Sequence, residues 1–484
     1  MVRKLMILLI AFLLSLPAFS KDFKVNVFGG RNSIVVKQEG DGTIENAYLL
    51  KVGSRKYKFN LKGDQTFRVE NLKEKSYKVV LKQQDKKSFF IPYKSVVQVY
   101  GNKYQEKLSP QQPSDAYLDR EIDELTIIWK DKPENNEQLG KYIGAEISYS
   151  NLRNQQKHLL LRGQRNTVVT TSQDVMVRLA YIPEQCIDTF YTSSFAVNAR
   201  EISLEDKWKS FSLPENINVC IDDSMRQSSI VQLYAKILLD KPENDPMVVA
   251  TEHKAENVNE LVGNFDSFYK RVILRVVNVL YAPGDDIINI KQLTNMVGAM
   301  VKEKEGFDGA TPAYLSHHQG KARMKLNAPY LENYYKRSNF NVLKNEQIGI
   351  FLHELTHAYQ HYPNYKKTEN ADHYFVGLEG MADAVRFIAK GFGDKERIGA
   401  GLQGEKSEKK WLTPYRVSAC FLMWLRNFDG DFVRKFHRTI KEIDHWSFDK
   451  AIHQILGEQY EAEQLWNLYL KDVKEEALEK GYLK

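Results

Sequence analysis

Apolar and polar residues alternate along the first part of the chain, from residue 21 to about residue 105. Runs such as Phe23–Phe28, Tyr57–Leu61 and Tyr77–Leu81 place an apolar side chain at every second position, and Gly, Asp and Asn stand between the runs. A period of two is typical of half-buried strands in an antiparallel sheet. Residues 21–105 are therefore predicted to form a β-sandwich module.

The same alternation returns in residues 116–200, for example in Leu125–Trp129, Ala145–Tyr149, Thr167–Thr170 and Val175–Tyr181. These strand lengths fit a second small β-sandwich in tandem with the first. The pattern therefore predicts an all-β N-terminal half of the chain.

Two stretches without a clear period, residues 106–120 and 201–215, are predicted to be connectors, the first because of Pro110, Pro113 and Ser114. After residue 215 the apolar residues recur at helical spacing, as in Phe268–Leu280. A chain of 484 residues is long enough for two to four domains. The predicted fold is multidomain, with two β-sandwich modules followed by a mainly α (α+β) domain over residues 215–484.

One helical run carries a metal-binding motif. Residues 345–361 read NEQIGIFLHELTHAYQH, with Asn345 as a candidate N-cap and Pro363 as the stop. Residues four apart share one face of a helix, so His353 and His357 can offer two imidazole nitrogens to one zinc ion while Glu354 faces a water molecule. This arrangement is that of a zinc hydrolase, and it requires a third ligand.

The third ligand is sought in the following segment. His361 lies eight residues beyond His353, about 12 Å along a helix, which is too far for both to bind one ion. A second helical pattern, residues 377–391, carries Glu379 and Asp383 four apart on one stripe. Catalytic zinc is often held by two histidines and a glutamate, with a carboxylate behind a ligating histidine. Glu379 is the predicted third ligand and Asp383 the carboxylate behind, against the plainer interpretation of two solvated charges.

The N-terminus has the features of a secretory signal. Arg3 and Lys4 precede the apolar run Leu5–Leu16, and Ala18-Phe19-Ser20 offers small residues for cleavage before Lys21. Residues 1–20 are expected to be removed, which predicts a secreted, periplasmic or cell-surface protein without an integral membrane span. An uncleaved anchor is the alternative, although the run is short for a bilayer.

The net charge bears on whether the protein binds nucleic acid, and the cysteine content bears on whether disulfides stabilise the fold. The net charge of +7 falls to +5 without Arg3 and Lys4, and the basic runs are interleaved with acids, so nucleic acid is not an expected partner. The cysteines are Cys186, Cys220 and Cys420. At most one disulfide is available, with Cys186 and Cys220 as the candidate pair and buried thiols as the alternative.

Three motifs in order resemble one family. His353–Gln360, Glu379–Arg386, and Trp411 followed by Tyr415–Leu422 are similar to the plant-type basic secretory protein family of metallopeptidases, which has bacterial members. The resemblance covers residues 265–475 and implies a secreted, gluzincin-like zinc peptidase. The segments 99–104 and 181–191 resemble fibronectin-like modules of bacterial surface proteins, which act as spacers or adhesion elements.

A mechanism follows from the predicted ligands. Zn²⁺ held by His353, His357 and Glu379 leaves a fourth position for water, and Glu354 is the expected general base. Tyr415 is the predicted donor to the oxyanion, or else a core aromatic residue. Arg386 is the substitute donor, or else the partner of an acidic residue. The expected substrate is a protein or peptide. The strand Lys325–Leu331 is a candidate edge strand for pairing with it, or else a core strand.

The sequence is also compatible with two other functions. The chain can be a non-catalytic surface protein that binds a glycan or glycoprotein through its β modules and holds a structural zinc ion, although structural zinc usually has four protein ligands. It can also be a zinc amidase or deacetylase that acts on cell-wall material. His317, His318 and His373 have no spacing that fits the metal and are predicted to be polar surface residues.

Overall fold

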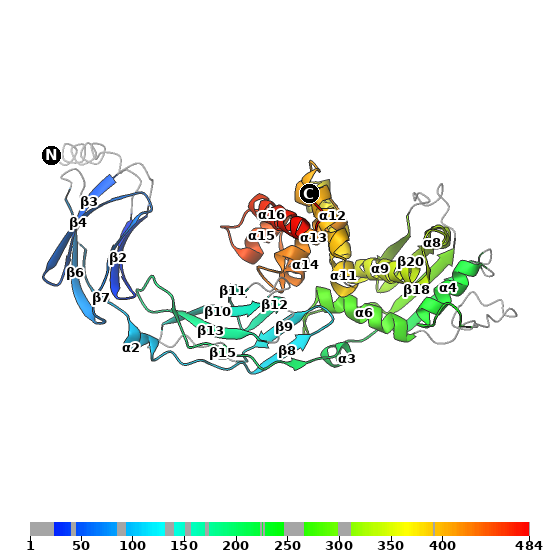
Figure 1. Ribbon diagram of the computed structural model, residues 1–484, viewed down its shortest axis with the longest axis horizontal. Helices are drawn as coiled ribbons and strands as arrows, with labels where there is room; N and C mark the ends of the chain where they lie inside the picture. Colours follow the sequence, from blue (N-terminus) through cyan, green and yellow to red (C-terminus); the bar gives the residue numbers. More distant parts are fainter. Residues whose placement is uncertain are drawn as a thin grey trace, which may run out of the picture.

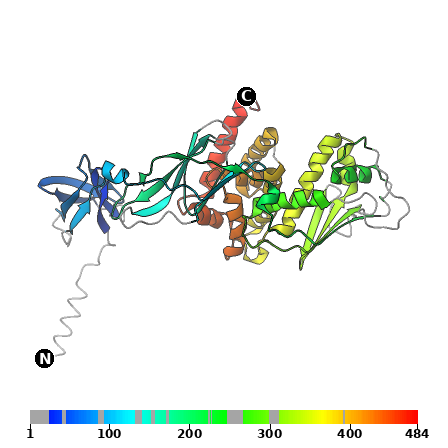
Figure 2. The ribbon, with the colours of Figure 1, turned by 90° about the horizontal axis from the view of Figure 1, so that it is seen from below.

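The computed structural model describes residues 24–39, 45–84, 93–130, 140–150, 156–169, 174–222, 225, 228–245, 266–298, 311–390 and 393–483. The predicted signal, residues 1–20, lies outside them. Along the longest axis of the molecule, the N-terminal strands occupy one end, a second set of strands follows, and the helices occupy the other end (Figures 1 and 2). The predicted fold class, an all-β region followed by a mainly helical α+β region, is confirmed.

The first set of strands forms two antiparallel sheets that face one another. One sheet has the order β1-β2-β5 and the other β4-β3-β6-β7. The strands are β1 (Lys24–Gly30), β2 (Ser33–Glu39), β3 (Glu45–Val52), β4 (Arg55–Lys62), β5 (Thr66–Val69), β6 (Ser76–Gln83) and β7 (Tyr93–Gln98). Their inward residues, among them Ile34, Tyr48 and Leu81, are fully buried in one apolar core. In sheet β4-β3-β6-β7, alternation in the sequence thus becomes one buried and one solvated face, whereas β2 is buried on both faces over Ser33–Val36.

A second sandwich follows the short helix α2 (Asn102–Gln105). Its sheets have the orders β11-β10-β13-β14, with β15 beside β13, and β12-β9-β8-β16. The strands are β8 (Asp115–Asp119), β9 (Glu124–Ile128), β10 (Lys141–Ser150), β11 (Gln156–Leu161), β12 (Arg165–Val169), β13 (Met176–Ile182), β14 (Phe190–Tyr191), β15 (Phe195–Ala196) and β16 (Arg200–Glu201). Trp129 and Phe190 are central in its core.

The two predicted connectors are more ordered than expected. Strand β8 lies inside the predicted linker 106–120 and pairs with β9 and β16. Helix α3 (Leu204–Lys207) lies inside 201–215, where the Ser203 hydroxyl accepts a hydrogen bond from the Asp206 N–H. Leu204 and Trp208 are buried in the core of the helical region. The connector predictions were wrong here because short apolar segments carry too little periodicity to reveal that they pack.

The C-terminal region combines one mixed sheet with helices. The sheet order is β17-β18-β20-β19, in which β17 (Asn216–Ile221), β18 (Gln292–Gly298) and β20 (Lys321–Asn327) are parallel and β19 (Ala313–His318) is antiparallel to β20. The helices that precede the metal motif are α4 (Ser229–Leu238), α6 (Asp266–Leu280) and α8 (Ala328–Tyr335). The predicted strand 325–331 ends at Asn327, because Pro329 fits the first turn of α8.

The remaining helices surround the region of the motif. They are α9 (Phe340–Tyr359), η2 (Tyr365–Lys367), α10 (Ala371–Phe375), η3 (Val376–Gly380), α11 (Met381–Lys390), α12 (Asp394–Glu405), η4 (Lys410–Leu412), α13 (Arg416–Leu425), α14 (Phe432–Glu442), α15 (Phe448–Leu456) and α16 (Ala462–Glu479). Among the described residues, no helix combines the length and apolarity that crossing a bilayer requires.

Buried charges join the second sandwich to the helical region. Asp119 on β8 accepts hydrogen bonds from Lys207 Nζ at 2.6 Å and from Asn278 Nδ2 on α6 at 2.8 Å. Glu124 on β9 pairs with Arg426 at 2.7 Å and with Arg434 at 2.8 Å. Charges this well paired across two segments fix their relative position, because separating them would leave buried groups without partners.

Candidate metal centre

Helix α9 presents the motif from a buried position. It begins at Phe340, where the Asn339 side chain accepts a hydrogen bond from the Val342 N–H, so the predicted start at Asn345 is too late. Phe351, Leu352 and Leu355 are buried and hold the helix in the core. The opposite face of the same turns carries the motif, so the helix is rigid where the site is built.

A π-helical turn, η3, carries Glu379. The sequence pattern predicts a regular helix from Gly377, whereas α10 runs into η3 and regular α-helix begins only at Met381. A side chain at Gly377 would overlap Pro363, and one at Gly380 would lie 2.3 Å from Ser418 Oγ. The two glycines therefore let this turn pack closely, and π-turns of this kind are frequent at functional sites.

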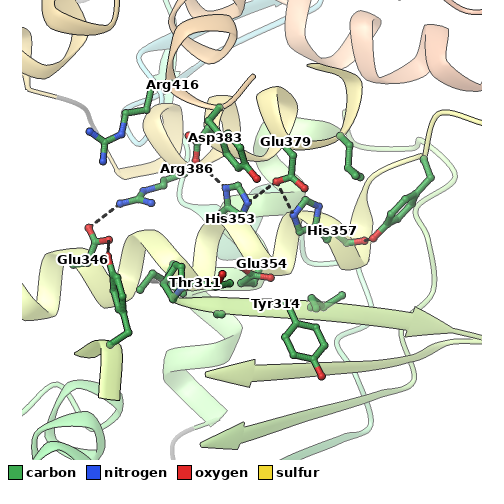
Figure 3. Close-up of a pocket in the computed structure, with 18 residues that line it drawn as sticks. Thr311, Tyr314, Glu346, His353, Glu354, His357, Glu379, Asp383, Arg386 and Arg416 are labelled. Atoms are coloured by element: carbon green, nitrogen blue, oxygen red, sulfur yellow. Dashed lines mark hydrogen bonds and ion pairs between the residues drawn. The ribbon is translucent and has the colours of Figure 1, made fainter. Parts of the chain in front are cut away.

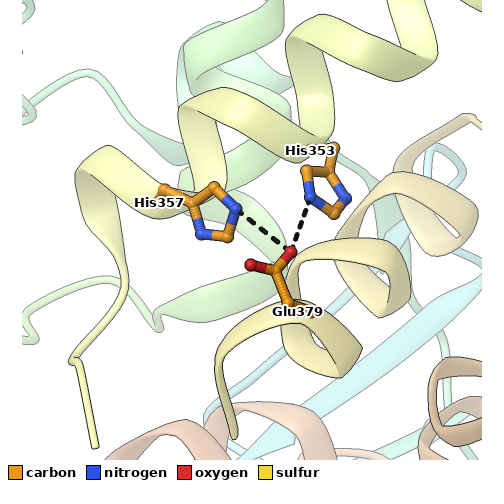
Figure 4. Close-up of side chains that lie close together, drawn as sticks. All are labelled: His353, His357 and Glu379. Atoms are coloured by element: carbon orange, nitrogen blue, oxygen red, sulfur yellow. Dashed lines mark hydrogen bonds and ion pairs between the residues drawn. The ribbon is translucent and has the colours of Figure 1, made fainter. Parts of the chain in front are cut away.

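The two histidines and Glu379 converge on one point (Figure 4). Glu379 Oε2 lies 3.2 Å from His353 Nε2 and 3.6 Å from His357 Nε2. One donor atom from each of the three residues lies within 4.8 Å of the others. The structure thus brings together the three predicted ligands, although they come from two separate elements.

Each imidazole also has a partner behind it. Asp383 Oδ1, on α11, lies 2.8 Å from His353 Nδ1. The Gln360 side-chain amide lies 2.9 Å from His357 Nδ1 and near the carbonyl of Leu378. Such partners fix the orientation of a ring so that its other nitrogen points to the centre.

The electrostatics of the cluster favour ionised groups at its centre. Burial lowers the pKa of His353, but hydrogen bonds to Asp383 and Glu379 outweigh burial and raise it above its ordinary value. Burial raises the pKa of Glu379, and the two histidines more than reverse this and hold it low. In Glu354 burial dominates, so its pKa is raised despite the histidines. A centre that keeps cations beside Glu379 in this way also suits a metal cation.

The donor set fits a zinc ion. Two imidazole nitrogens and one carboxylate oxygen are a known catalytic zinc set, and three protein ligands leave one position open. Glu354 is 5% exposed, and its Oε2 is buried without a hydrogen-bond partner. A buried carboxylate oxygen without a partner needs a donor, which a water molecule in the open position would supply.

A cleft of about 570 Å³ opens over this cluster. Figure 3 shows Thr311 and Tyr314 on one side of the two histidines and Glu379 and Asp383 on the other. Ala313, Tyr314 and Leu315 of β19 line the cleft. Since β20 lies between β18 and β19, it is the core strand of the two predicted alternatives and not an edge strand. The outermost described strand on this side of the sheet is β19.

Comparison with protein families identifies the helical part of the chain. Residues 253–469 match the family model BSP, described as "Peptidase of plants and bacteria". The C-terminal region carries the BSP domain. This match confirms the resemblance drawn from the three motifs, and it supports a peptidase activity in general. No curated protein matches the chain.

The N-terminal half matches a family whose function is unknown. Residues 25–190 match the model DUF4998, "Domain of unknown function", which covers the first sandwich and most of the second. Similar solved structures include chicken CNTN1 domains FN1–FN3, with a TM-score of 0.21 and 10% identity over 37% of this chain and 64% of that chain. A segment of two fibronectin type III domains from chicken tenascin has a TM-score of 0.14 and 11% identity over 36% of this chain and 95% of that chain.

Tyr415 lies at the mouth of the cleft in the BSP domain. Its ring stacks on that of His353, with centroids 6.2 Å apart and planes at 18°. Its backbone has φ 60° and ψ −129°, a conformation that costs a non-glycine residue about 1–3 kcal/mol. Burial and the carboxylates of Glu379, Asp383 and Glu354 raise the pKa of Tyr415 to about 12, so the phenol keeps its proton.

The substitute donor, Arg386, is held beside the cleft. It pairs with Glu346 at 2.9 Å (Figure 3). A Cβ at Gly349 on α9 would lie 2.6 Å from Arg386 Nε, so this glycine leaves the space in which the guanidinium crosses the helix. Because a carboxylate already neutralises Arg386, Tyr415 is the better placed of the two predicted donors.

Among the described residues, the other histidines considered from the sequence take no part in the cluster. His361 stacks on His437, with centroids 4.4 Å apart. His373 is 3% exposed and its Nδ1 accepts a hydrogen bond from the Phe448 N–H, so its prediction as a surface residue was wrong. His317 and His318 lie on β19, where His318 is exposed.

The structure also shows the state of the three cysteines and the contacts of two residues that follow the motif. Cys186, Cys220 and Cys420 are thiols, so the candidate pair does not form a disulfide. Sequence reasoning did not assign a role to Gln360 or to Tyr362, whose hydroxyl donates to the His357 carbonyl at 2.8 Å. The position of Gln360, three residues after His357 at the C-cap of the same helix, is the signal that could have pointed to it.

Proposed function

We propose that the protein is a zinc-dependent peptidase whose BSP domain cleaves peptide bonds. The observation that supports this most is the convergence of His353, His357 and Glu379 next to the unpartnered carboxylate oxygen of Glu354. The predicted secretory signal and a secreted or periplasmic location are part of the same proposal. A protein or peptide is the expected substrate.

Each residue of the site would have a separate role in this reaction. When bound by His353, His357 and Glu379, zinc would polarise the scissile carbonyl and acidify a water molecule. Glu354 takes the proton of the attacking water and delivers it to the leaving amine, a role that suits a carboxylate whose pKa is raised by burial. Asp383 holds the His353 ring through Nδ1, and the Tyr415 hydroxyl donates to the developing oxyanion.

Strand β19 offers a way to hold the substrate. An extended peptide can add to the outer strand of a sheet by main-chain hydrogen bonds. Because Ala313–Leu315 line the cleft beside the histidines, a peptide laid along β19 would pass over the cluster. This supports an extended polypeptide as substrate better than a compact small molecule.

The decisive experiment uses the purified mature chain and a mixed peptide library read by mass spectrometry. We expect new amino termini that disappear with a chelator and return with zinc. Glu354→Gln should keep one equivalent of zinc and lose about 10²–10⁴-fold in rate. Glu379→Ala should lose both zinc and activity. Glu408→Gln, an exposed residue, is the matched control.

Three outcomes would contradict the proposal. Full cleavage by the Glu354→Gln variant would remove the general base. Stoichiometric zinc in Glu379→Ala would remove Glu379 from the ligands. Release of acetate or of sugar amines from wall material without new amino termini would assign the site to an amidase or deacetylase.

A further inference from the structure

The positive charge of the chain is concentrated in its first sandwich. Residues 21–105 contain eighteen lysines and arginines against eight aspartates and glutamates, a net charge of +10, whereas the whole chain has +7. The remainder of the chain is therefore net acidic. A mild overall charge conceals one strongly basic module.

The strand register gathers this charge on one face. In the sheet β4-β3-β6-β7, Tyr48, Leu50, Leu61 and Leu81 point into the core. The alternate positions point outward, and seven of them are lysines: Lys51, Lys56, Lys58, Lys62, Lys78, Lys82 and Lys94. We call these seven residues the lysine face. All are exposed, and the strands carry one acidic residue on that side, Glu45.

The lysine face keeps its positive charge within the part of the chain that the structure describes. None of its seven lysines forms an ion pair with a described residue. Lys51 lies directly opposite Lys56 on the neighbouring strand, and Lys94 lies in the same cross-strand row. Like charges directly opposite one another destabilise a sheet. The arrangement therefore lowers the stability of the free module, and an anionic partner would relieve the repulsion.

The position of the face leaves it open to a large partner. The second sandwich contacts the first through the other sheet and the β1–β2 turn, where Arg68 and the Arg31 backbone N–H bind Asp188. Sheet β4-β3-β6-β7 forms the outer layer at the end of the molecule farthest from the BSP domain (Figure 1). A partner bound there would not obstruct the cleft.

We propose that the lysine face docks the protein onto an anionic lipid bilayer. The lysines form a two-dimensional array across four strands, so a planar surface can meet most of them, whereas a single linear polyanion along one row meets at most three. The face presents no aromatic side chain on which a sugar ring or a base could stack. The outward apolar side chains, those of Leu49, Val80 and Val96, are shorter than the lysines, so they do not prevent the lysines from contacting a bilayer.

Vesicle sedimentation with the mature full-length chain tests this proposal. We expect binding to vesicles of 30% phosphatidylglycerol in phosphatidylcholine at low salt, none to pure phosphatidylcholine, and release at high salt. Each lysine near an anionic membrane strengthens binding about fivefold, so Lys51→Gln/Lys56→Gln/Lys94→Gln should weaken it about a hundredfold. The control Lys24→Gln/Lys73→Gln/Lys103→Gln makes the same charge change elsewhere on the module.

Thermal unfolding separates loss of binding from loss of structure. Because the triple substitution on the lysine face removes like-charge repulsion, its Tm should equal or exceed that of the wild type. Equal vesicle binding by the two triple variants would overturn the proposal. So would binding to dextran sulfate or DNA without binding to the anionic vesicles, which would assign the face to a soluble polyanion.

Discussion

The buried pair of Lys207 and Asp119 gives a sharp test of how the second sandwich is attached to the BSP domain. Both side chains are 1% exposed; Asp119 Oδ2 accepts hydrogen bonds from Lys207 Nζ and Asn278 Nδ2, and Oδ1 accepts one from the Glu121 N–H. Lys207→Met keeps the length of the side chain but removes the cation. Asp119 would then be a buried carboxylate with only two neutral donors, Asn278 Nδ2 and the Glu121 N–H. Removing one partner of a buried pair costs about 3–5 kcal/mol.

The pair itself is expected to contribute little. Burial and the nearby Arg434 lower the pKa of Lys207 although Asp119 and Glu124 oppose the shift, so desolvation and repulsion together outweigh the attraction that the ammonium gains. The double variant Lys207→Met/Asp119→Asn removes both charges. We expect it to recover most of the lost free energy of unfolding, to within about 1 kcal/mol of wild type.

Urea unfolding followed by tryptophan fluorescence measures both effects, because Trp208 donates to Asn278 Oδ1 next to the pair. Lys209→Met, at an exposed position, is the control and should change the free energy by less than about 0.5 kcal/mol. A loss below about 1 kcal/mol in Lys207→Met would refute the reasoning. A double variant as unstable as the single one would refute the claim that the cost comes from the stranded carboxylate.

Three further predictions concern the metal centre. Asp383→Asn should weaken zinc binding about 10–100-fold in a competition titration, with Asp286→Asn, at an exposed position, as the control. Unchanged affinity would show that Asp383 does not hold His353. Tyr415→Phe should lose about 10²–10³-fold in rate without loss of Tm. Tyr415→Gly should lose the same factor in rate, but its free energy of unfolding should rise by up to about 1–3 kcal/mol because the backbone strain is relieved. A fully active Tyr415→Phe variant would exclude the phenol as donor. In the zinc-free protein the raised pKa of His353 contributes stability that is complete below pH 6.5 and is lost as the pH rises through the raised value, so Tm should fall from pH 6.5 upward. The zinc-loaded protein should not show this fall, because its His353 imidazole carries no proton to lose. Parallel curves of Tm against pH with and without chelator would contradict this prediction.

The lysine face adds a different kind of function to the same chain. If the first sandwich lies on a bilayer, the BSP domain is at the opposite end of an elongated molecule (Figure 1). The peptidase cleft would then face substrates away from the lipid. Docking and cleavage can be tested separately, since neither experiment depends on the residues of the other.

The sequence by itself determined the classes of structure and the donors of the site. Period-two alternation predicts both sandwiches because one face of each strand is buried, and this depends only on local spacing. His353 and His357 share a helix face for the same reason. Glu379 and Asp383 could be selected from sequence because they follow in a second amphipathic segment.

Tertiary structure decided everything that depends on residues distant in the chain. The π-turn at η3 arises where Gly377 and Gly380 pack against Pro363 and Ser418, and no local pattern predicts it. The edge position of β19 depends on the order of strands in the sheet. Lys207 lies in a segment that the sequence predicts to be a connector. It is buried because the fold pairs it with Asp119, which lies 88 residues earlier in the chain. Long-range pairings of this kind leave no periodicity in the sequence, since only the folded chain brings the partners together.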